Sequence, residues 1–392
     1  MSAKWMLDLV FRCEKLGIVV ATFSNITLLY LLAFKASSSY GAYRHLMFAY
    51  TIVEIIYSLL SFLSGMVAHS TENTFVIFSL YRGYVERSIA PLFLVDFCGS
   101  YFTLLLLLVV HFIYRFFVVC DFKKLVYFNG YYLAFWIVGA VFCGFANGIL
   151  KFFTFPENER LTNDLREDFM IYYNLTMDQV VYNGPNYYIC DQNNKCQTPI
   201  ADWITMIYLS IGLVFSVLIM CYCGYRCTLK LNKKDPNASI RTADLQKQLM
   251  IALVIQSVIP IVLMYIPIFL LFITPMFRLG FDHWQMRLAT AVISPPKDQF
   301  TRTIHSVIPI VIMYIHINLL FITPMFRLRF GPYVNIAMAT VAIYPPVDQF
   351  AIIYVIKDFR TTIRDFLNCK KKSVSPTSSV VFVSRWSNKS VY

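Results

Sequence analysis

Residues 91–119 read PLFLVDFCGSYFTLLLLLVVHFIYRFFVV. Asp96 near the start and Arg115 near the end are the formal charges of this stretch, and most residues between them are apolar. A helix rises about 1.5 Å per residue, so a run of this length is long enough to cross the ~30 Å hydrocarbon core of a bilayer. Backbone amides in lipid must bond within their own segment, which predicts a membrane-spanning helix and excludes an isolated strand.

The same pattern recurs along the chain. The composition is 58% hydrophobic and 14% charged over 392 residues, which is typical of a polytopic membrane protein and excludes an ordinary soluble enzyme. The first apolar run is longer than a signal-peptide core and lacks a small-residue cleavage site, so we expect it to be retained. Together with 91–119, the predicted spans are 16–34, 46–67, 131–150, 203–222, 248–273 and 333–356. They form a bundle within residues 1–368, and residues 369–392 are a tail.

The distribution of Lys and Arg predicts the orientation. With the N-terminus outside, the cytoplasmic loops and the tail carry 19 of these residues, against 9 on the N-terminus and the first two outer loops. The positive-inside rule favours this arrangement, in which the C-terminus is cytoplasmic. The net charge of +12 is then explained by contact with anionic membrane lipid, and no nucleic-acid partner is expected.

The long loop at 151–202 is predicted to lie outside. It is acidic and aromatic, and it contains the sequon Asn174-Leu-Thr, which predicts a glycosylated Asn174. Cys190 and Cys196 lie in the same loop on the oxidising side. Two disulfides are compatible with this topology: Cys98 with one of the loop cysteines, or Cys190 with Cys196. Cys369, which precedes three lysines, is a candidate for palmitoylation.

The chain lacks patterns that would indicate an enzyme or a metal site. No CxxC pair has matching His spacing, and HExxH and GxSxG motifs are absent. The histidines are scattered singly, so no cofactor is expected. They are His45, His69, His111, His283, His305 and His316.

Four short stretches point to a receptor family. The third predicted span ends in HFIYR, a TADLQKQ stretch leads into the sixth, and the last contains YPPVD followed by KDFR; these are residues 111–115, 242–248, 344–348 and 357–360. Taken together, they resemble the nematode serpentine chemoreceptors of the Str superfamily, and the resemblance extends from about Leu16 to Leu367. Arg115 taken alone has another explanation, because a guanidinium at a helix end can extend to the headgroups.

The resemblance implies a seven-transmembrane G-protein-coupled receptor on sensory cilia. Such a receptor senses a small, often volatile, odorant and signals to a heterotrimeric G protein, with Tyr114 and Arg115 at the coupling surface. Pro260 and Pro346 interrupt the helical hydrogen-bond ladder and are candidate hinges. Residues 357–367 have the periodicity of a short amphipathic helix on the inner leaflet.

Three carboxylates fall inside predicted spans, where charged groups normally face the interior of a bundle. Asp96 is near the outer end of its span, so we expect it to line a ligand pocket. Glu54 and Asp348 are expected to form polar contacts between helices.

The chain also contains a direct repeat. Residues 257–279 and 306–328 are identical at 20 of 23 positions, and PP-DQF recurs at 295–300 and 345–350. The repeat duplicates the helix 6/7 segment over about 280–328. Either both copies cross the membrane, or one copy is displaced from a seven-helix core, which we favour.

A ligand-gated channel or transporter is the alternative class. The sequence contains no filter-like Gly run and no pair of inverted broken helices, so the receptor interpretation is preferred.

Overall fold

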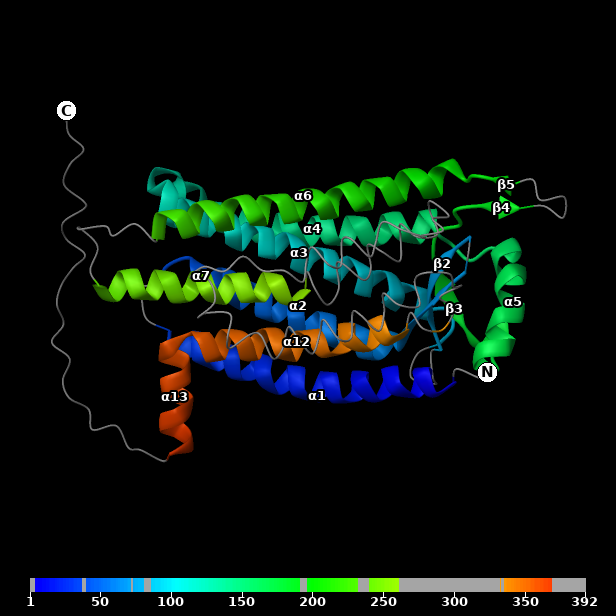
Figure 1. The fold of residues 1–392 in the computed structure, drawn as a ribbon, viewed down its shortest axis with the longest axis horizontal. Coiled ribbons are helices and arrows are strands. Elements are labelled where there is room, and N and C mark those ends of the chain that lie inside the picture. Colours follow the sequence, from blue (N-terminus) through cyan, green and yellow to red (C-terminus); the bar gives the residue numbers. More distant parts are fainter. Residues whose placement is uncertain are drawn as a thin grey trace, which may run out of the picture.

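The computed structural model describes residues 4–36, 40–71, 73–80, 86–190, 196–231, 240–260, 332 and 335–368. Within these ranges, long helices lie side by side along one common axis (Figure 1). They are α1 (Lys4–Phe34), α2 (Tyr43–Ser64), α3 (Ala90–Cys120), α4 (Tyr131–Thr154), α6 (Ile200–Leu231), α7 (Ile240–Pro260) and α12 (Asn335–Val355).

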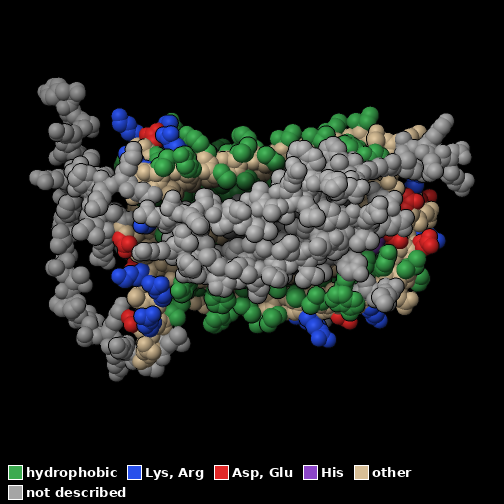
Figure 2. Space-filling model, in the orientation of Figure 1, with side chains coloured by type: hydrophobic (Ala, Val, Ile, Leu, Met, Phe, Trp, Pro, Cys, Tyr) green, Lys and Arg blue, Asp and Glu red, His purple; other side chains and the backbone are tan. Residues whose placement is uncertain are grey.

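The surface of the bundle is suited to lipid. Helices α1, α2, α3, α4 and α6 are long and apolar enough to cross a membrane, and Val341–Val355 is a shorter apolar helix. Large apolar side chains remain exposed along the bundle, including Phe135, Phe142 and Phe153 of α4. Figure 2 shows apolar side chains along its length and Lys and Arg gathered mainly at the end that carries α13. These features confirm the predicted all-α membrane fold.

The first helix is longer than the predicted span. It begins at Lys4, well before Leu16, because an apolar run stops at charged residues whereas a helix continues past them. Met6 and Val10 are buried against the rest of the structure, and the exposed Arg12 lies on another face.

The second helix begins and ends three residues earlier than predicted; it ends at Ser64, so that Met66 and Val67 belong to a strand. The cause is local. Gly65 adopts a left-handed conformation with φ 49°, and its N–H bonds to the carbonyl of Ser61, which terminates the helix.

Helix α3 is the centre of the bundle and packs most closely against α4. A Cβ atom added at Gly144 would overlap the Thr103 hydroxyl and would lie 2.7 Å from the carbonyl oxygen of Gly99. Gly148 also lies against the backbone of α3. These small residues allow the two backbones to approach each other closely, as is common between membrane helices.

A small folded cap covers the end of the bundle that carries the N-terminus (Figure 1). Its antiparallel sheet has the order β1-β2-β3, and helix α5 lies beside it. The elements are β1 (Met66–Ser70), β2 (Phe75–Ser79), β3 (Val181–Asn183), α5 (Glu159–Tyr173) and η3 (Met177–Gln179), with a separate pair, β4 (Ile189–Cys190) and β5 (Cys196–Gln197). Strands β1 and β2 join α2 to α3, whereas β3 belongs to the loop between α4 and α6, so the sheet unites two loops.

The opposite end carries η2 (Phe122–Phe128) and α13 (Lys357–Leu367). Helix α13 crosses the bundle axis at a steep angle (Figure 1). Phe359 is fully buried and stacks on Tyr40 with ring centroids 6.0 Å apart, whereas Phe366 is 82% exposed. An amphipathic helix in this place is suited to lie at a membrane surface.

Two predictions concern residues outside the described part of the chain. They are the placement of the duplicated segment at 280–328 and the tail that contains Cys369.

Candidate functional site

Arg115 lies inside the bundle, near the end that carries α13. Its side chain is buried, with 2% relative exposure. Its Nη1 donates a hydrogen bond to Oε1 of Gln246 on α7 at 2.6 Å, and its guanidinium carbon lies 3.7 Å from the centroid of the Tyr43 ring on α2. The charge therefore joins three helices, and this geometry argues against a guanidinium that extends to the headgroups.

Tyr114, the neighbour of Arg115, is also buried. Its ring stacks on Tyr43 at 5.7 Å and meets the edge of Phe128 in η2 at 5.2 Å. Tyr114 thus packs the η2 segment and α2 against α3, and its side chain is not presented on the surface of the bundle.

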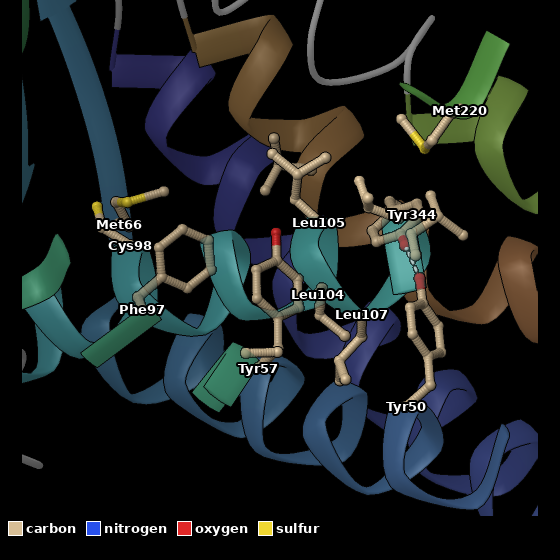
Figure 3. Close-up of a cluster of buried hydrophobic side chains, with 14 of the residues drawn as sticks. Tyr50, Tyr57, Met66, Phe97, Cys98, Leu104, Leu105, Leu107, Met220 and Tyr344 are labelled. Atoms are coloured by element: carbon tan, nitrogen blue, oxygen red, sulfur yellow. Dashed lines mark hydrogen bonds between the residues drawn. The ribbon is translucent and has the colours of Figure 1, made fainter. Parts of the chain in front are cut away.

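A second polar cluster lies deeper in the bundle and joins α2, α7 and α12. The hydroxyls of Tyr50 and Tyr344 are 2.6 Å apart (Figure 3). Tyr50 also donates to Oδ2 of Asp348 at 3.3 Å, and Nε2 of Gln256 donates to the same oxygen at 3.3 Å. All four residues are buried, so each polar contact exists away from bulk water.

His111 connects the two clusters. Its ring meets Tyr43 and Tyr50 edge to face, with centroids 5.4 and 5.6 Å apart. Nδ1 lies 2.7 Å from the carbonyl oxygen of Leu107, one turn earlier in α3. A continuous set of side chains therefore runs from Gln246 through Arg115 and His111 to Asp348.

Glu54 lies next to the second cluster and is fully buried. It interacts electrostatically with Asp348, and neither carboxylate oxygen of Glu54 has a hydrogen-bond partner within the described ranges. Glu54 and Asp348 are therefore neighbours on facing helices. Asp348 forms the expected polar contacts between spans, whereas Glu54 forms no side-chain hydrogen bond among the described residues.

Asp96 differs from the prediction. Its side chain is exposed on the outside of the bundle, whereas its neighbours Val95, Phe97 and Cys98 are buried. Successive residues of a helix point about 100° apart, and the apolar neighbours of Asp96 occupy the inward face. Asp96 therefore does not line the interior formed by the described helices.

The cysteines are placed differently from one another. Cys98 is a free, buried thiol that packs in one apolar cluster with Met66 and Phe97 (Figure 3). Cys190 and Cys196 are direct backbone partners across the β4–β5 pair. This register brings together the two residues of one of the alternative disulfides, which stays a prediction.

The predicted modification and hinge residues lie at helix ends or interruptions. Asn174 follows the last residue of α5 in a left-handed conformation with φ 56°, and its side chain is exposed. Pro260 is the last residue of α7 as described, and Pro346 lies inside α12 directly after Pro345. Within the described ranges, no group of three or more His, Cys, Asp or Glu side chains is arranged to hold a metal ion.

Sequence comparison decides the family. The profile of the family described as "Serpentine type 7TM GPCR chemoreceptor Str" matches residues 10–302 and 297–364. The chain belongs to this family of serpentine chemoreceptors. The two matched ranges overlap at 297–302, a stretch that begins within the first copy of the PP-DQF segment, and this double match reflects the duplication in the chain.

Individual nematode relatives of this Str-family chain agree with the family match. The chain is 26% identical over 377 residues to "Serpentine receptor class r-10" of Caenorhabditis briggsae, covering 95% of the chain and 94% of the relative. It is 25% identical to the protein of the same name from Caenorhabditis elegans, with 97% of each chain covered. "G-protein coupled receptor str-33" of C. elegans is 29% identical over 275 residues, covering 69% of the chain and 79% of that relative.

The sequence motifs indicate Arg115 but not its partners Tyr43 and Gln246. They also do not indicate Tyr50 and Gln256, which are the partners of Asp348. One available signal was spacing: His111 and Arg115 are four residues apart in a helix, so they share a face. Uncharged polar residues inside apolar spans are a second, weaker signal of buried contacts between helices.

Proposed function

We propose that this chain is a chemosensory receptor of the plasma membrane, in sensory cilia, with its N-terminus outside and its C-terminus in the cytoplasm. It binds a small, volatile odorant in the half of the bundle beneath the cap and signals to a heterotrimeric G protein at the end that carries α13. The observation that carries the proposal is the buried contact of Arg115 with Gln246, which joins α3 to α7 at that end.

Signalling uses two states of the bundle. In the state seen here, Arg115 of α3 holds Gln246 of α7. A ligand that binds better to a second state shifts the population toward it by its difference in affinity. When α7 moves away from α3, the contact breaks and the inner ends of these helices separate, which makes room for a G-protein segment.

Helix α12 is suited to transmit the change. Pro345 and Pro346 have no N–H, so the usual helical bonds to the carbonyls of Val341 and Ala342 are missing. Asp348 lies directly beyond this interruption and is bonded to α2 and α7. A bend at Pro346 therefore moves a residue that contacts both helices.

The chemistry of the outer half favours an apolar ligand. A large buried apolar cluster, part of which is drawn in Figure 3, extends through the bundle and includes Tyr50. Its members toward the cap include Met66, Leu94, Phe97, Cys98 and Met206. Trp203 of α6 donates its indole N–H to the carbonyl of Tyr187 at 2.9 Å, and this bond holds the connection between α4 and α6 against the first turn of α6. The membership in a receptor family favours this function over a channel or transporter.

The test is a reporter assay for G-protein signalling in cells that display the receptor and are screened with a panel of volatile compounds. Arg115→Ala removes the contact that holds the resting state, so it should raise the basal signal. Because Arg115 is also proposed to belong to the coupling surface, the variant should reduce the maximal ligand response by about ten-fold at equal surface display, within the usual range of coupling energies. Arg12→Ala is the matched control, because Arg12 is an exposed cation on the opposite half of the molecule. A full response from Arg115→Ala would refute the coupling role.

A further inference from the structure

A buried hydrogen-bonded histidine fastens the cap to the helices. His69 of β1 is fully buried, and its two ring nitrogens contact two residues of α5. Nε2 lies 3.2 Å from Oδ2 of Asp168, and Nδ1 lies 3.0 Å from the hydroxyl of Tyr173. The same hydroxyl accepts a bond from Nδ2 of Asn335 at 3.2 Å, and Asn335 Oδ1 accepts from the backbone N–H of Ala68 at 2.9 Å.

These contacts join three elements that are far apart in the sequence. His69 and Ala68 are in the first outer connection, Asp168 and Tyr173 are in the long loop, and Asn335 is the first residue of α12. Helix α12 also carries Tyr344 and Asp348 of the deeper cluster. The group of His69, Asp168, Tyr173 and Asn335, here called the cap latch, therefore connects the cap directly to the helix with the candidate hinge.

The atoms of the cap latch accommodate two protonation states of His69. A neutral imidazole donates from Nε2 to Asp168 and accepts from the Tyr173 hydroxyl at Nδ1. A protonated imidazole donates from both nitrogens, and the Tyr173 hydroxyl then turns toward the carbonyl oxygen of Ala68, 3.5 Å away. Every nitrogen is satisfied in both states, so a proton can enter without leaving a buried group unpaired.

One acidic side chain lies beside the His69 imidazole. Asp168 supplies a negative charge at hydrogen-bonding distance, with 17% side-chain exposure. The other groups that face the imidazole are uncharged: Phe169, Tyr172 and Tyr173 from α5, and Val76 directly opposite in β2. Burial raises the pKa of Tyr173 far above its usual range, so this phenol remains a hydroxyl in both states.

We infer that the cap latch is a proton-binding site that fastens the cap more firmly to the bundle when the surrounding solution becomes acidic. Imidazole is the side chain that ordinarily changes charge between about pH 5 and pH 8. The bond from an imidazolium to a carboxylate is stronger than the bond from a neutral imidazole, because both partners are charged. The inference does not depend on the proposed ligand or G protein; the statement that the acidity is external depends on the proposed orientation.

A consequence that rests on the ligand site proposed above is slower ligand exchange in acid. The cap covers the end of the bundle above the apolar cluster, and acid stabilises its attachment to both β1 and α12. Opening of the cap is then less frequent, so entry and escape of a ligand slow together.

Hydrogen exchange of the purified, full-length receptor in lipid nanodiscs tests the inference. Exchange is followed at about pH 5.5 and about pH 7.5, on either side of the usual histidine titration, and is corrected for the intrinsic effect of pH on exchange. We expect amides of 66–70 and 159–173 to be protected about three- to five-fold more strongly in acid, as one charge-assisted bond replaces a neutral one.

Three variants complete the test. His69→Gln keeps a donor for Asp168 and an acceptor for Tyr173 but does not titrate, so its protection should not change with pH. His45→Gln is the matched control, since His45 is exposed near the other end of the bundle, and it should behave like the unmodified receptor. Asp168→Asn keeps the imidazole and removes the charge, so the change should shrink.

The outcomes are distinct from those of the signalling assay, because exchange needs neither an odorant nor a G protein. Protection that does not differ between the two pH values in the unmodified receptor overturns the inference. So does a pH-dependent change that persists in His69→Gln.

Discussion

The guanidinium of Arg115 lies over the face of Tyr43, 3.7 Å from the ring centroid, in the interior of the bundle. Among the described residues, Arg115 forms no ion pair with a carboxylate. A buried cation without such a partner depends on other contacts that stabilise its charge. The aromatic face and the Gln246 oxygen therefore take the place of an acidic partner in holding this charge.

Replacing Tyr43 should remove the cation–π contact that stabilises the buried Arg115 guanidinium. Tyr43→Leu removes the aromatic face and should lower the free energy of unfolding by about 2 kcal/mol, the size of a desolvated cation–π contact. Tyr43→Phe keeps the face and should lose much less. Thermal unfolding of the purified receptor measures the difference; equal losses in the two variants would contradict a cation–π role.

Removal of one hydroxyl should uncouple the deeper cluster. Tyr50→Phe deletes the group that contacts both Tyr344 and Asp348, and the loss of a hydrogen bond that leaves a buried polar partner unsatisfied costs about 1–3 kcal/mol. We expect a lower unfolding temperature and a changed basal signal in the reporter assay. Tyr30→Phe is the control, because Tyr30 is exposed on α1. Identical behaviour of the two variants would exclude a role for the Tyr50 hydroxyl.

The contact between α1 and α12 should be sensitive to a single methyl group. A Cβ atom added at Gly17 would overlap the carbonyl oxygen of Ala342, and a backbone atom cannot move aside cheaply. Gly17→Ala should therefore destabilise the receptor by about 1–3 kcal/mol. Gly139→Ala is the matched control, because a Cβ atom there meets nothing within 4 Å. Thermal unfolding that does not separate the two variants would show that α1 and α12 are not packed as described.

Glycosylation at Asn174 tests the orientation. Asn174 is exposed in the turn after α5, so the proposed topology places it within reach of the glycosylation machinery. The receptor from a eukaryotic membrane should migrate faster after glycosidase treatment, and Asn174→Gln should abolish this shift. Asn388→Gln in the tail should leave the shift intact. An unmodified Asn174 together with a modified tail would reverse the topology.

The long helices were predictable from sequence, because a lipid environment demands apolar runs of a certain length. The rotation of each helix was not. The length predicted for the third span is close to that of α3. Asp96, however, is predicted to line a pocket and lies on the outer face of the described bundle. The position of a residue within an apolar run does not determine the direction in which its side chain points. The sheet of the cap was missed for a related reason: Met66 and Val67 continue an apolar run, and only the turn at Gly65 separates them from α2.

For the candidate site too, the sequence predicts the local motif but not the contacts between helices. Arg115 was found because its motif is local in the sequence. Gln246 and Tyr43 contact it from other helices, and such contacts depend on helix rotation and crossing angle, which the apolar pattern leaves open.

The sheet of the cap has a mechanical consequence. Strands β1 and β2 belong to the connection between α2 and α3, and β3 belongs to the connection between α4 and α6, so backbone bonds tie four helix ends together. Helices whose ends are joined at the cap can separate mainly at their opposite ends. A small tilt beneath the cap is then amplified along each helix, and the widest movement falls at the end where Arg115 lies.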